Sequence, residues 1–243
     1  THDLRNRILF TLFILSVYRF GTFIPIPGID PEQLQVMMES NQKGLLGMFN
    51  VFAGGAVSRM AIFALGIMPY ISSSIIIQLM GSVIPYFQRL QKEGEAGRKK
   101  ITQITRYGTV LLASMQSYGV VAVFLPSLNS NGNTVVFNPG VLFVFTGIIS
   151  MVTGTLLLMW LGERITESGI GNGISLIIMV GIISAFPNVV ISEIALVREG
   201  VREPLSELIL VGIMFAIICF VVLLTQGTRK IPVQYAKRVV GRK

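Results

Sequence analysis

Two clusters of basic residues have the clearest chemical capacity in this sequence, which is to bind anions. RLQKEGEAGRKK covers residues 89–100, and TRKIPVQYAKRVVGRK covers residues 228–243. Cations gathered in this way bind an acidic partner, whether lipid or nucleic acid. Basic loops beside a membrane also commonly serve only to orient the protein or to contact anionic lipids. The residues leave both uses open, and the glycines within the clusters predict mobile loop tips.

Residues for catalysis or for metal binding are sparse. The 243 residues include one histidine and one cysteine, and the G-x-S-x-G, H-E-x-x-H and phosphate-loop motifs are absent. The stretch ESGIGNGISL, residues 167–176, has the glycine spacing of a dinucleotide fingerprint. It follows a predicted helix rather than a strand, so we interpret it as a tight loop. We therefore expect no enzyme, no cofactor and no metal site.

The elements that position these residues are predicted to be membrane-spanning helices. With 52% hydrophobic and 13% charged residues and a mean hydropathy of +0.70, the chain is too apolar for a soluble globular protein. We predict an all-α integral membrane protein with six spans, at residues 8–23, 60–84, 107–125, 141–161, 174–194 and 205–224. Fifteen Lys and Arg residues lie in loops on the side of the N-terminus and four on the opposite side, which predicts a cytoplasmic N-terminus.

The stretch MFNVFAGGAVSRMAIFALGIMPYI, residues 48–71, begins as an apolar helix and breaks at two glycines. Residues 45–53 would form about 13 Å of helix, too short to cross a hydrocarbon core of about 30 Å. Irregular backbone at membrane depth requires protein or a water-filled cavity around it, which predicts a re-entrant half-helix. The alternative is an interfacial helix on the outer surface. Arg19 lies in the outer half of the first span, where we expect it to reach outward to the membrane surface without a specific role.

One face of the second span changes from apolar to polar. Ile67, Ile71, Ser74 and Gln78 recur at steps of four, three and four. Gln78 is expected to face the bundle interior, where it either bonds a neighbouring helix or lines an aqueous funnel. Ile174 and Ile178 have the same spacing in the fifth span, although isoleucines at helical spacing are usually ordinary packing.

Several strings together resemble the bacterial SecY family, whose members are the central subunit of the protein-translocation channel. They are RFGTFIPIPGID, MFNVFAGGAVSRMAIFALGIMPYISSSIIIQL, KEGEAGRKK, TRYGT, MWLGERITESGIGNGISLII and YAKR. The similarity covers nearly the whole chain. Because the family has ten spans, the chain resembles the first six, with residues 1–194 as the first five-span half of an inverted repeat. Residues 195–243 would hold the sixth span and the start of the next cytoplasmic loop.

The resemblance implies roles for four groups of residues. Residues 44–58 match the plug that closes the channel from outside, including Leu45, Leu46, Met48, Phe49, Phe52, Gly54 and Gly55. The apolar pore ring would include Ile67, Ile71, Ile174 and Ile178. Ser74 and Gln78 would belong to the lateral gate. Docking of the ribosome or of the SecA motor ATPase would use Arg98, Lys99, Lys100, Arg229, Lys230, Lys237 and Arg238.

The implied function is passive conduction of polypeptides across the bacterial cytoplasmic membrane, with insertion of membrane segments through the lateral gate. The implied partners are the SecE and SecG subunits, SecA, the large ribosomal subunit with its RNA, signal sequences, nascent polypeptides and membrane lipids. The residues alone also permit a secondary transporter with a solute site at the broken helix. Such a site should offer ionisable side chains, whereas the half-helix offers Met48, Phe49, Val51 and Phe52.

Overall fold

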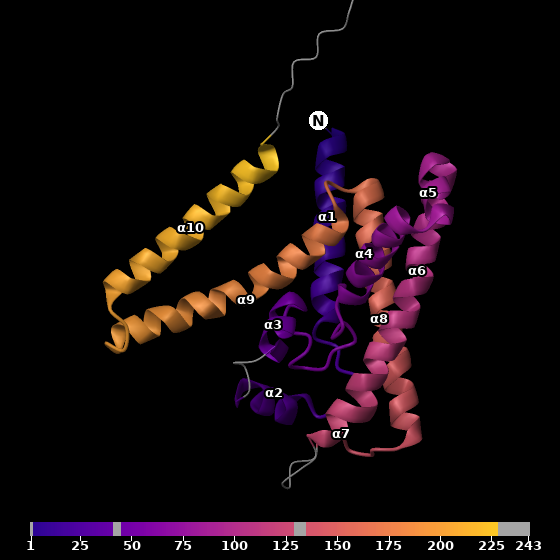
Figure 1. The fold of residues 1–243 in the computed structure, drawn as a ribbon. Helices are drawn as coiled ribbons and strands as arrows, with labels where there is room; N and C mark the ends of the chain where they lie inside the picture. Colours follow the sequence, from indigo (N-terminus) through magenta and orange to yellow (C-terminus); the bar gives the residue numbers. More distant parts are fainter. Residues whose placement is uncertain (1, 41–44, 129–134, 228–243) are drawn as a thin grey trace, which may run out of the picture. The chain divides into compact units, whose positions relative to one another are not determined.

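The computed structural model describes residues 2–40, 45–128 and 135–227, and these are almost entirely helical (Figure 1). Within these ranges the β structure consists of two isolated bridges, Pro25 with Ala61 and Ile29 with Val136. The chain divides into two compact units, Thr1–Pro187 and Asn188–Lys243. The predicted boundary at residue 194 between a first half and a sixth span stays a prediction.

The first unit is a helical bundle. Its elements are α1 (His2–Gly21), α2 (Pro31–Ser40), α3 (Leu45–Phe52), α4 (Met68–Val83), α5 (Pro85–Lys92), α6 (Glu95–Tyr118), the π-helix η1 (Gly119–Phe124), α7 (Leu125–Ser127), α8 (Val141–Ser168) and the first part of α9 (Gly173–Arg198). Helix α6 packs between α4 and α8, and α1 packs on the other side of α8. The tight loop before α9 is confirmed, because the Asn172 side chain accepts hydrogen bonds from the amides of Ile174 and Ser175.

Four helices are long and apolar enough to cross a membrane, where six spans were predicted. They are the continuous stretch Glu95–Ser127, α8, α9 and α10 (Pro204–Gln226), and α4 with α5 makes a fifth if this pair, bent by 98°, counts as one span. The first predicted span is helical in α1. Arg7 and Arg19 leave only 11 uncharged residues between them, about 16 Å of helix. The described residues therefore have the predicted all-helical membrane fold, with four or five candidate spans.

The basic segment at residues 89–100 differs from the predicted mobile loop, because it forms an ordered helical hairpin. Helices α5 and α6 are joined at Gly94, whose φ of +70° is a backbone conformation that favours glycine. Phe87 and Leu90 of α5 are buried with Ile77 of α4, and Ile101 and Ile104 of α6 pack against them. This order was missed from the sequence because α5 is only eight residues long and its two buried side chains pack on residues of α4 and α6, which no pattern within α5 indicates.

The loop rich in proline after α1 fastens the irregular segment that follows α3. The amide of Ile26 donates to the carbonyl of Met60, and the amide of Ile62 donates to the carbonyl of Ile24, both at 3.0 Å. These two hydrogen bonds hold together chain segments about 35 residues apart.

Helix α2, which was not predicted from the sequence, follows this loop. Asp30 caps its N-terminus by accepting hydrogen bonds from the amides of Glu32 and Gln33.

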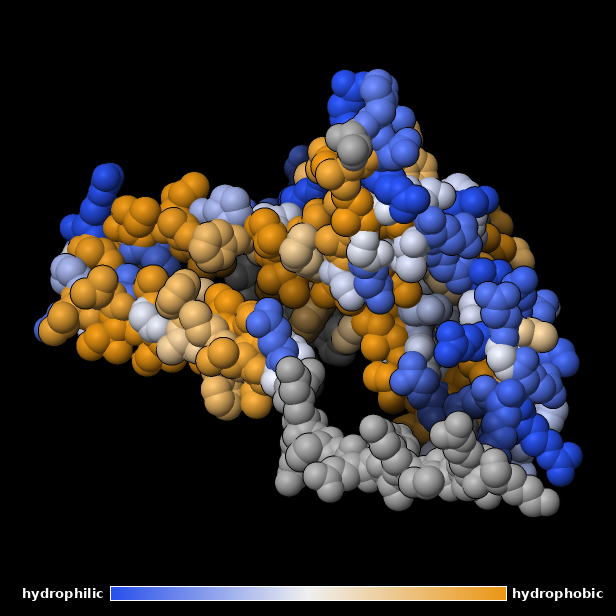
Figure 2. All heavy atoms as spheres, turned by 90° about the horizontal axis from the view of Figure 1, so that it is seen from above, coloured by the Kyte–Doolittle hydropathy of each residue, from blue (hydrophilic) through white to orange (hydrophobic). Residues whose placement is uncertain are grey.

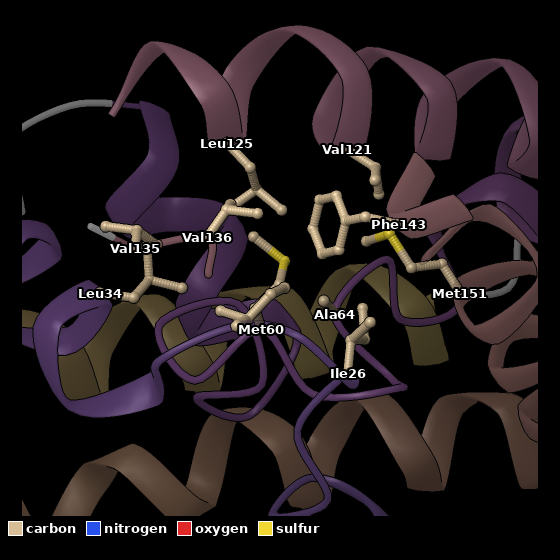
Figure 3. Close-up of a cluster of buried hydrophobic side chains, with 11 residues drawn as sticks. Ile26, Leu34, Met60, Ala64, Val121, Leu125, Val135, Val136, Phe143 and Met151 are labelled. Atoms are coloured by element: carbon tan, nitrogen blue, oxygen red, sulfur yellow. The ribbon is translucent and has the colours of Figure 1, made fainter. Parts of the chain in front are cut away.

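A large buried apolar cluster lies where this loop, the irregular segment, η1 and α8 meet (Figure 3). Met60 is at its centre and is 1% exposed. Side chains from several elements surround it, namely Ile26, Leu34, Ala64, Val121, Leu125, Val135, Val136, Phe143 and Met151. The core of the first unit is thus built around backbone that is not helical.

The second unit holds the end of α9 and helix α10. Arg202, in the turn between them, pairs with Glu193 at 2.8 Å and with Glu207 at 3.6 Å. Helix α10 has no buried residue, and Figure 2 shows a largely hydrophobic surface on this unit. A regular helix satisfies its own backbone hydrogen bonds, so an apolar surface of this kind is suited to lipid or to further membrane helices.

Candidate functional site

The broken second span is the most unusual region of the first unit. Helix α3 has eight residues, and α4 starts only at Met68, so residues 53–67 form a run of turns between them. No residue of this run is exposed, and Ala56 and Ala61 are fully buried. The expected half-helix and break are present, and protein encloses the irregular backbone, as backbone at membrane depth requires. The side chains of Leu45, Leu46, Met48 and Phe49 lie outside the described set.

Local hydrogen bonds give this run a defined shape. The Gly55 amide donates to the carbonyl of Asn50 at 2.8 Å, and the Ser58 amide donates to the Asn50 side-chain oxygen at 2.9 Å. Gly54 and Gly55 have φ angles of +65° and +82°, which only glycine adopts without strain. Met60 has a φ of +42°, an uncommon conformation for a residue with a side chain. The backbone is therefore held in a specific fold of its own.

An apolar cavity of about 720 Å³ borders this run. Phe52, Ala53 and Val57 form part of its wall, and among the described residues its polar lining consists of Tyr18, Ser72 and Gln116. The remaining wall comes from Met60, Ala64, Leu65, Gly66, Ile67, Met68, Ile71, Gly119, Val120, Phe124, Met151, Leu158, Ile177 and Ile178. A surface of this composition repels water and offers few groups that could bind a polar solute.

The four isoleucines of the predicted pore ring come together in one apolar cluster. Ile67 is buried in it, and Ile71, Ile174 and Ile178 are partly buried against it. Three of them line the cavity, whereas Ile174 packs toward Gly162 of α8. The structure thus brings these residues from two helices to one place, and their role as a ring stays a prediction.

Ser74 and Gln78 lie on a face of α4 that is open in the first unit. Gln78 is exposed and donates to the Ser74 hydroxyl of its own helix at 3.3 Å. The packed face is the neighbouring one, where Ser73 donates to the Thr105 carbonyl of α6 at 2.9 Å. Of the two arrangements considered for Gln78, the described residues therefore show no bond to another helix.

The expectation for Arg19 is wrong, because its side chain points into the protein. Its Nη1 donates to the Gly54 carbonyl at 2.8 Å and to the Ser184 hydroxyl of α9 at 3.1 Å. The guanidinium also lies 5.0 Å from the ring centre of Phe23, and the Arg59 guanidinium lies 4.4 Å from the same ring. Sequence reasoning assigned neither arginine a role at the half-helix. A charge within a predicted span is by default a functional hypothesis, and that signal was present for Arg19.

The predicted docking cations that the structure describes lie at one end of the first unit. Arg98, Lys99 and Lys100 are exposed in the first two turns of α6, and Figure 2 shows hydrophilic residues over this region. Lys100 approaches Glu93 at 3.8 Å. Arg106, by contrast, forms a two-bond ion pair with Glu163 of α8. Arg229, Lys230, Lys237 and Arg238 lie outside the described residues.

Known structures share this fold. A structure described as "The structure of a protein conducting channel" matches with a TM-score of 0.54 and 17% sequence identity, over 74% of this chain and 36% of that one. The canine Sec61 chain in a ribosome-channel complex from the endoplasmic reticulum gives the same values. At this level of identity the likeness shows the fold.

Sequence relatives are much closer. The protein translocase subunit SecY of Rickettsia bellii (strain RML369-C) is 52% identical over all 243 residues, which span 56% of that relative. The same subunit of Escherichia coli (strain K12) is 50% identical over 99% of this chain and 54% of its own length. The chain thus spans about half the length of the curated relatives it matches. Residues 61–243 match the SecY family as a whole, and this chain belongs to that family.

Proposed function

We propose that this chain forms the first half of a protein-conducting channel in the bacterial cytoplasmic membrane, with its N-terminus in the cytoplasm. The observation that carries the proposal is the irregular run at residues 53–67, which has no exposed residue and lies against an apolar cavity and the isoleucine cluster. Its relatives in the SecY family are named protein translocase subunits. The residues act by shape and hydrophobicity, without a catalytic step.

An apolar wall suits a channel whose cargo varies in sequence. Side chains that bound one polypeptide segment tightly would slow its release, whereas aliphatic side chains contact every segment weakly. Ile67, Ile71, Ile174 and Ile178 would form one part of a constriction that excludes water and thereby ions when no polypeptide is present. Residues 44–58 would be the plug, the part that moves aside.

The exposed face with Ser74 and Gln78 would be one side of the lateral gate. Its polar groups are not used in packing against α6, because that contact belongs to the face of Ser73. A face of this kind is available to close against a partner helix and to open toward lipid. Signal sequences and membrane segments would leave the channel there.

A transporter is the weaker proposal. The structure does bring Arg19 and Arg59 to the broken helix, and ionisable groups there were the feature expected of a solute site. However, Arg19 already donates to Gly54 and Ser184. The lining of the cavity is apolar apart from three side chains, so it offers little to coordinate a solute.

The exposed cations on the α5–α6 hairpin support docking of a cytoplasmic partner. Arg98, Lys99 and Lys100 are exposed close to the N-terminus of α6, and of these three only Lys100 has a described carboxylate within 4.0 Å, that of Glu93. A ribosome with its RNA or the SecA ATPase would compensate this charge, and a structural relative is described within a ribosome-channel complex. SecE and SecG would complete the channel in the membrane.

Ion conductance of the full-length protein in planar bilayers tests the proposed function. Replacing Ile67, Ile71, Ile174 and Ile178 together with serine should raise the resting conductance, because a wetted constriction no longer excludes ions. The matched control replaces Ile75, Ile76, Ile182 and Ile183, exposed residues of the same two helices, with serine. Equal conductance of both variants and the wild type would overturn the assignment of the pore.

Docking is tested by a salt titration of full-length protein against ribosomes, with SecA binding measured in parallel. Alanine at Arg98, Lys99, Lys100, Lys237 and Arg238 should weaken binding. It should also flatten the dependence of log affinity on log salt by roughly 0.7 to 0.9 for each phosphate that is no longer neutralised. A variant that exchanges Arg98 and Arg238 for lysine keeps the charge and should keep the slope. Unchanged affinities and slopes for both partners would leave these cations as topology determinants.

A further inference from the structure

Arg19 joins three parts of the first unit at a single nitrogen atom. It extends from the last turn of α1, and its Nη1 donates to the Gly54 carbonyl and to the Ser184 hydroxyl. Ser184 in turn donates to the Gly181 carbonyl within α9 at 2.7 Å. The irregular run is thereby connected to both α1 and α9 through one charged donor.

The packing around this hydrogen bond is closer than ordinary side chains allow. A Cβ atom at Gly54 would lie 3.2 Å from the Gly181 Cα and 3.1 Å from the Tyr18 hydroxyl oxygen. A Cβ at Gly181 would lie 2.9 Å from the Phe52 carbonyl oxygen. Because neither Gly54 nor Gly181 has a side chain, the irregular run can lie directly on α9. It is then close enough for one Arg19 guanidinium to reach both Gly54 and Ser184.

The acceptors of Arg19 are neutral, and this matters for how the contact can be broken. Within the described residues neither Arg19 nor Arg59 has a carboxylate within 4.0 Å, although other arginines of the chain do form ion pairs. A carbonyl bonded to a guanidinium in a site sheltered from water forms one of the stronger neutral-acceptor bonds. Such a bond holds the run in place. When it breaks, no unpaired carboxylate is left buried, as would happen if an ion pair were separated.

Arg59 provides a comparison at the same aromatic ring, that of Phe23. Both guanidinium groups lie over that ring, but the buried Nη1 of Arg59 has no hydrogen-bond partner within the described residues. The two cations also repel each other, since they share one ring without an intervening anion. Of the two, Arg19 is the one that ties the run to other helices.

We propose that Arg19 is a positioning residue that latches residues 53–55 onto α1 and α9 and so keeps the plug closed at rest. This inference rests on the proposed function, because it assigns to the latch the closed state of the same channel. The latch opens when residues 53–55 move away from α9, after which the carbonyl and the guanidinium are free to bond water.

The rate at which a thiol reagent labels a cysteine at position 53 tests the latch. Ala53 is buried and lines the cavity, so Ala53→Cys in a Cys219→Ser background of the full-length protein should react slowly at rest. Adding Arg19→Met should accelerate labelling by a water-soluble maleimide about tenfold or more, as expected from the loss of a hydrogen bond with a charged donor. Arg19→Lys keeps a charged donor and should restore much of the slow labelling.

Two controls separate the latch from a general loss of folding. Arg59→Met removes a cation from the same ring and should leave the labelling rate unchanged. A cysteine placed instead at Ala113, which is fully buried in α6, should react equally slowly with and without Arg19→Met. Acceleration at both positions would mean that the variant unfolds, and the latch would be wrong.

The latch proposal and the proposed channel function can be overturned independently of each other. If Arg19→Met leaves the labelling of position 53 slow while the serine ring variant leaks ions, the latch is overturned and the proposed function stands. If the ring variant does not leak, the proposed function falls regardless of the labelling. Acceleration by Arg19→Met, restored by Arg19→Lys and absent with Arg59→Met, supports the latch.

Discussion

The irregular run at residues 53–67 and helix α10 satisfy their backbone groups in opposite ways. The run is buried or partly buried along its whole length and forms hydrogen bonds with the loop at residues 24–26, with Asn50 and with Arg19. Helix α10 has no buried residue, and its backbone bonds are internal to the helix. Both are apolar in sequence, yet of the two α10 is the one that could lie directly in lipid.

This difference shows where specificity resides in the molecule. A regular helix tolerates any apolar surrounding, whereas the run depends on particular neighbours at particular distances. Substitutions that enlarge or empty sites around the run should therefore be costly, and the same substitutions in α10 should be mild. Paired variants of the full-length, detergent-solubilised protein, with one position of each kind, measure this contrast.

The largest effect is expected at Gly154 of α8. A Cβ there would overlap the carbonyl of Ile62, so Gly154→Leu must displace the run or the helix. We expect loss of folded protein in size-exclusion chromatography at ordinary temperature. Gly212→Leu in α10 meets open space and should elute like the wild type. Normal elution of Gly154→Leu would mean that the run is not packed as described.

A smaller but clear effect is expected at Met60. Met60→Ala empties a site that is 1% exposed and should destabilise the protein by about 2–5 kcal/mol. Met60→Gly should be no worse, because glycine relieves the positive φ. Met214→Ala in α10, which is 44% exposed, should change stability little. The midpoints of heating curves measure all three, and equal midpoints for Met60→Ala and Met214→Ala would contradict the comparison.

The smallest effect is expected at Ser73 of α4, the helix that follows the run. Ser73→Ala removes a buried hydrogen bond to the Thr105 carbonyl and should cost about 1 kcal/mol, or a few degrees in the midpoint. Thr225→Ala in α10 removes an exposed bond to its own helix and should cost less. A larger shift for Thr225→Ala would reverse the expected order of the two regions.

The sequence was sufficient for the long apolar helices and for one loop. The spans predicted at 141–161 and 205–224 lie within α8 and α10. Hydropathy alone is enough to identify long apolar helices of this kind. The loop at residues 167–176 was also predicted, since Asn172 and the glycines mark a helix start. Helix α2 was missed, although Asp30 followed by Pro31 is a start signal.

The irregular run was predicted only in part, for a physical reason. The two glycines marked the break, but α4 was expected from residue 60 and begins at Met68. What keeps residues 60–62 out of the helix is bonding to residues 24–26, and no local pattern indicates a partner so distant. The partners of Arg19 lie 35 and 165 residues away, so its inward orientation was equally hidden.

The most direct test of the central claim is whether the enclosed run becomes accessible when the channel is in use. Val57 lines the cavity and is not exposed, so Val57→Cys in a Cys219→Ser background reports on the run itself. Labelling by a water-soluble maleimide from outside should be slow in resting full-length channels and markedly faster when a translocating polypeptide is arrested within them. Equal rates in the two states would contradict a movable plug and leave residues 53–67 as a fixed part of the core.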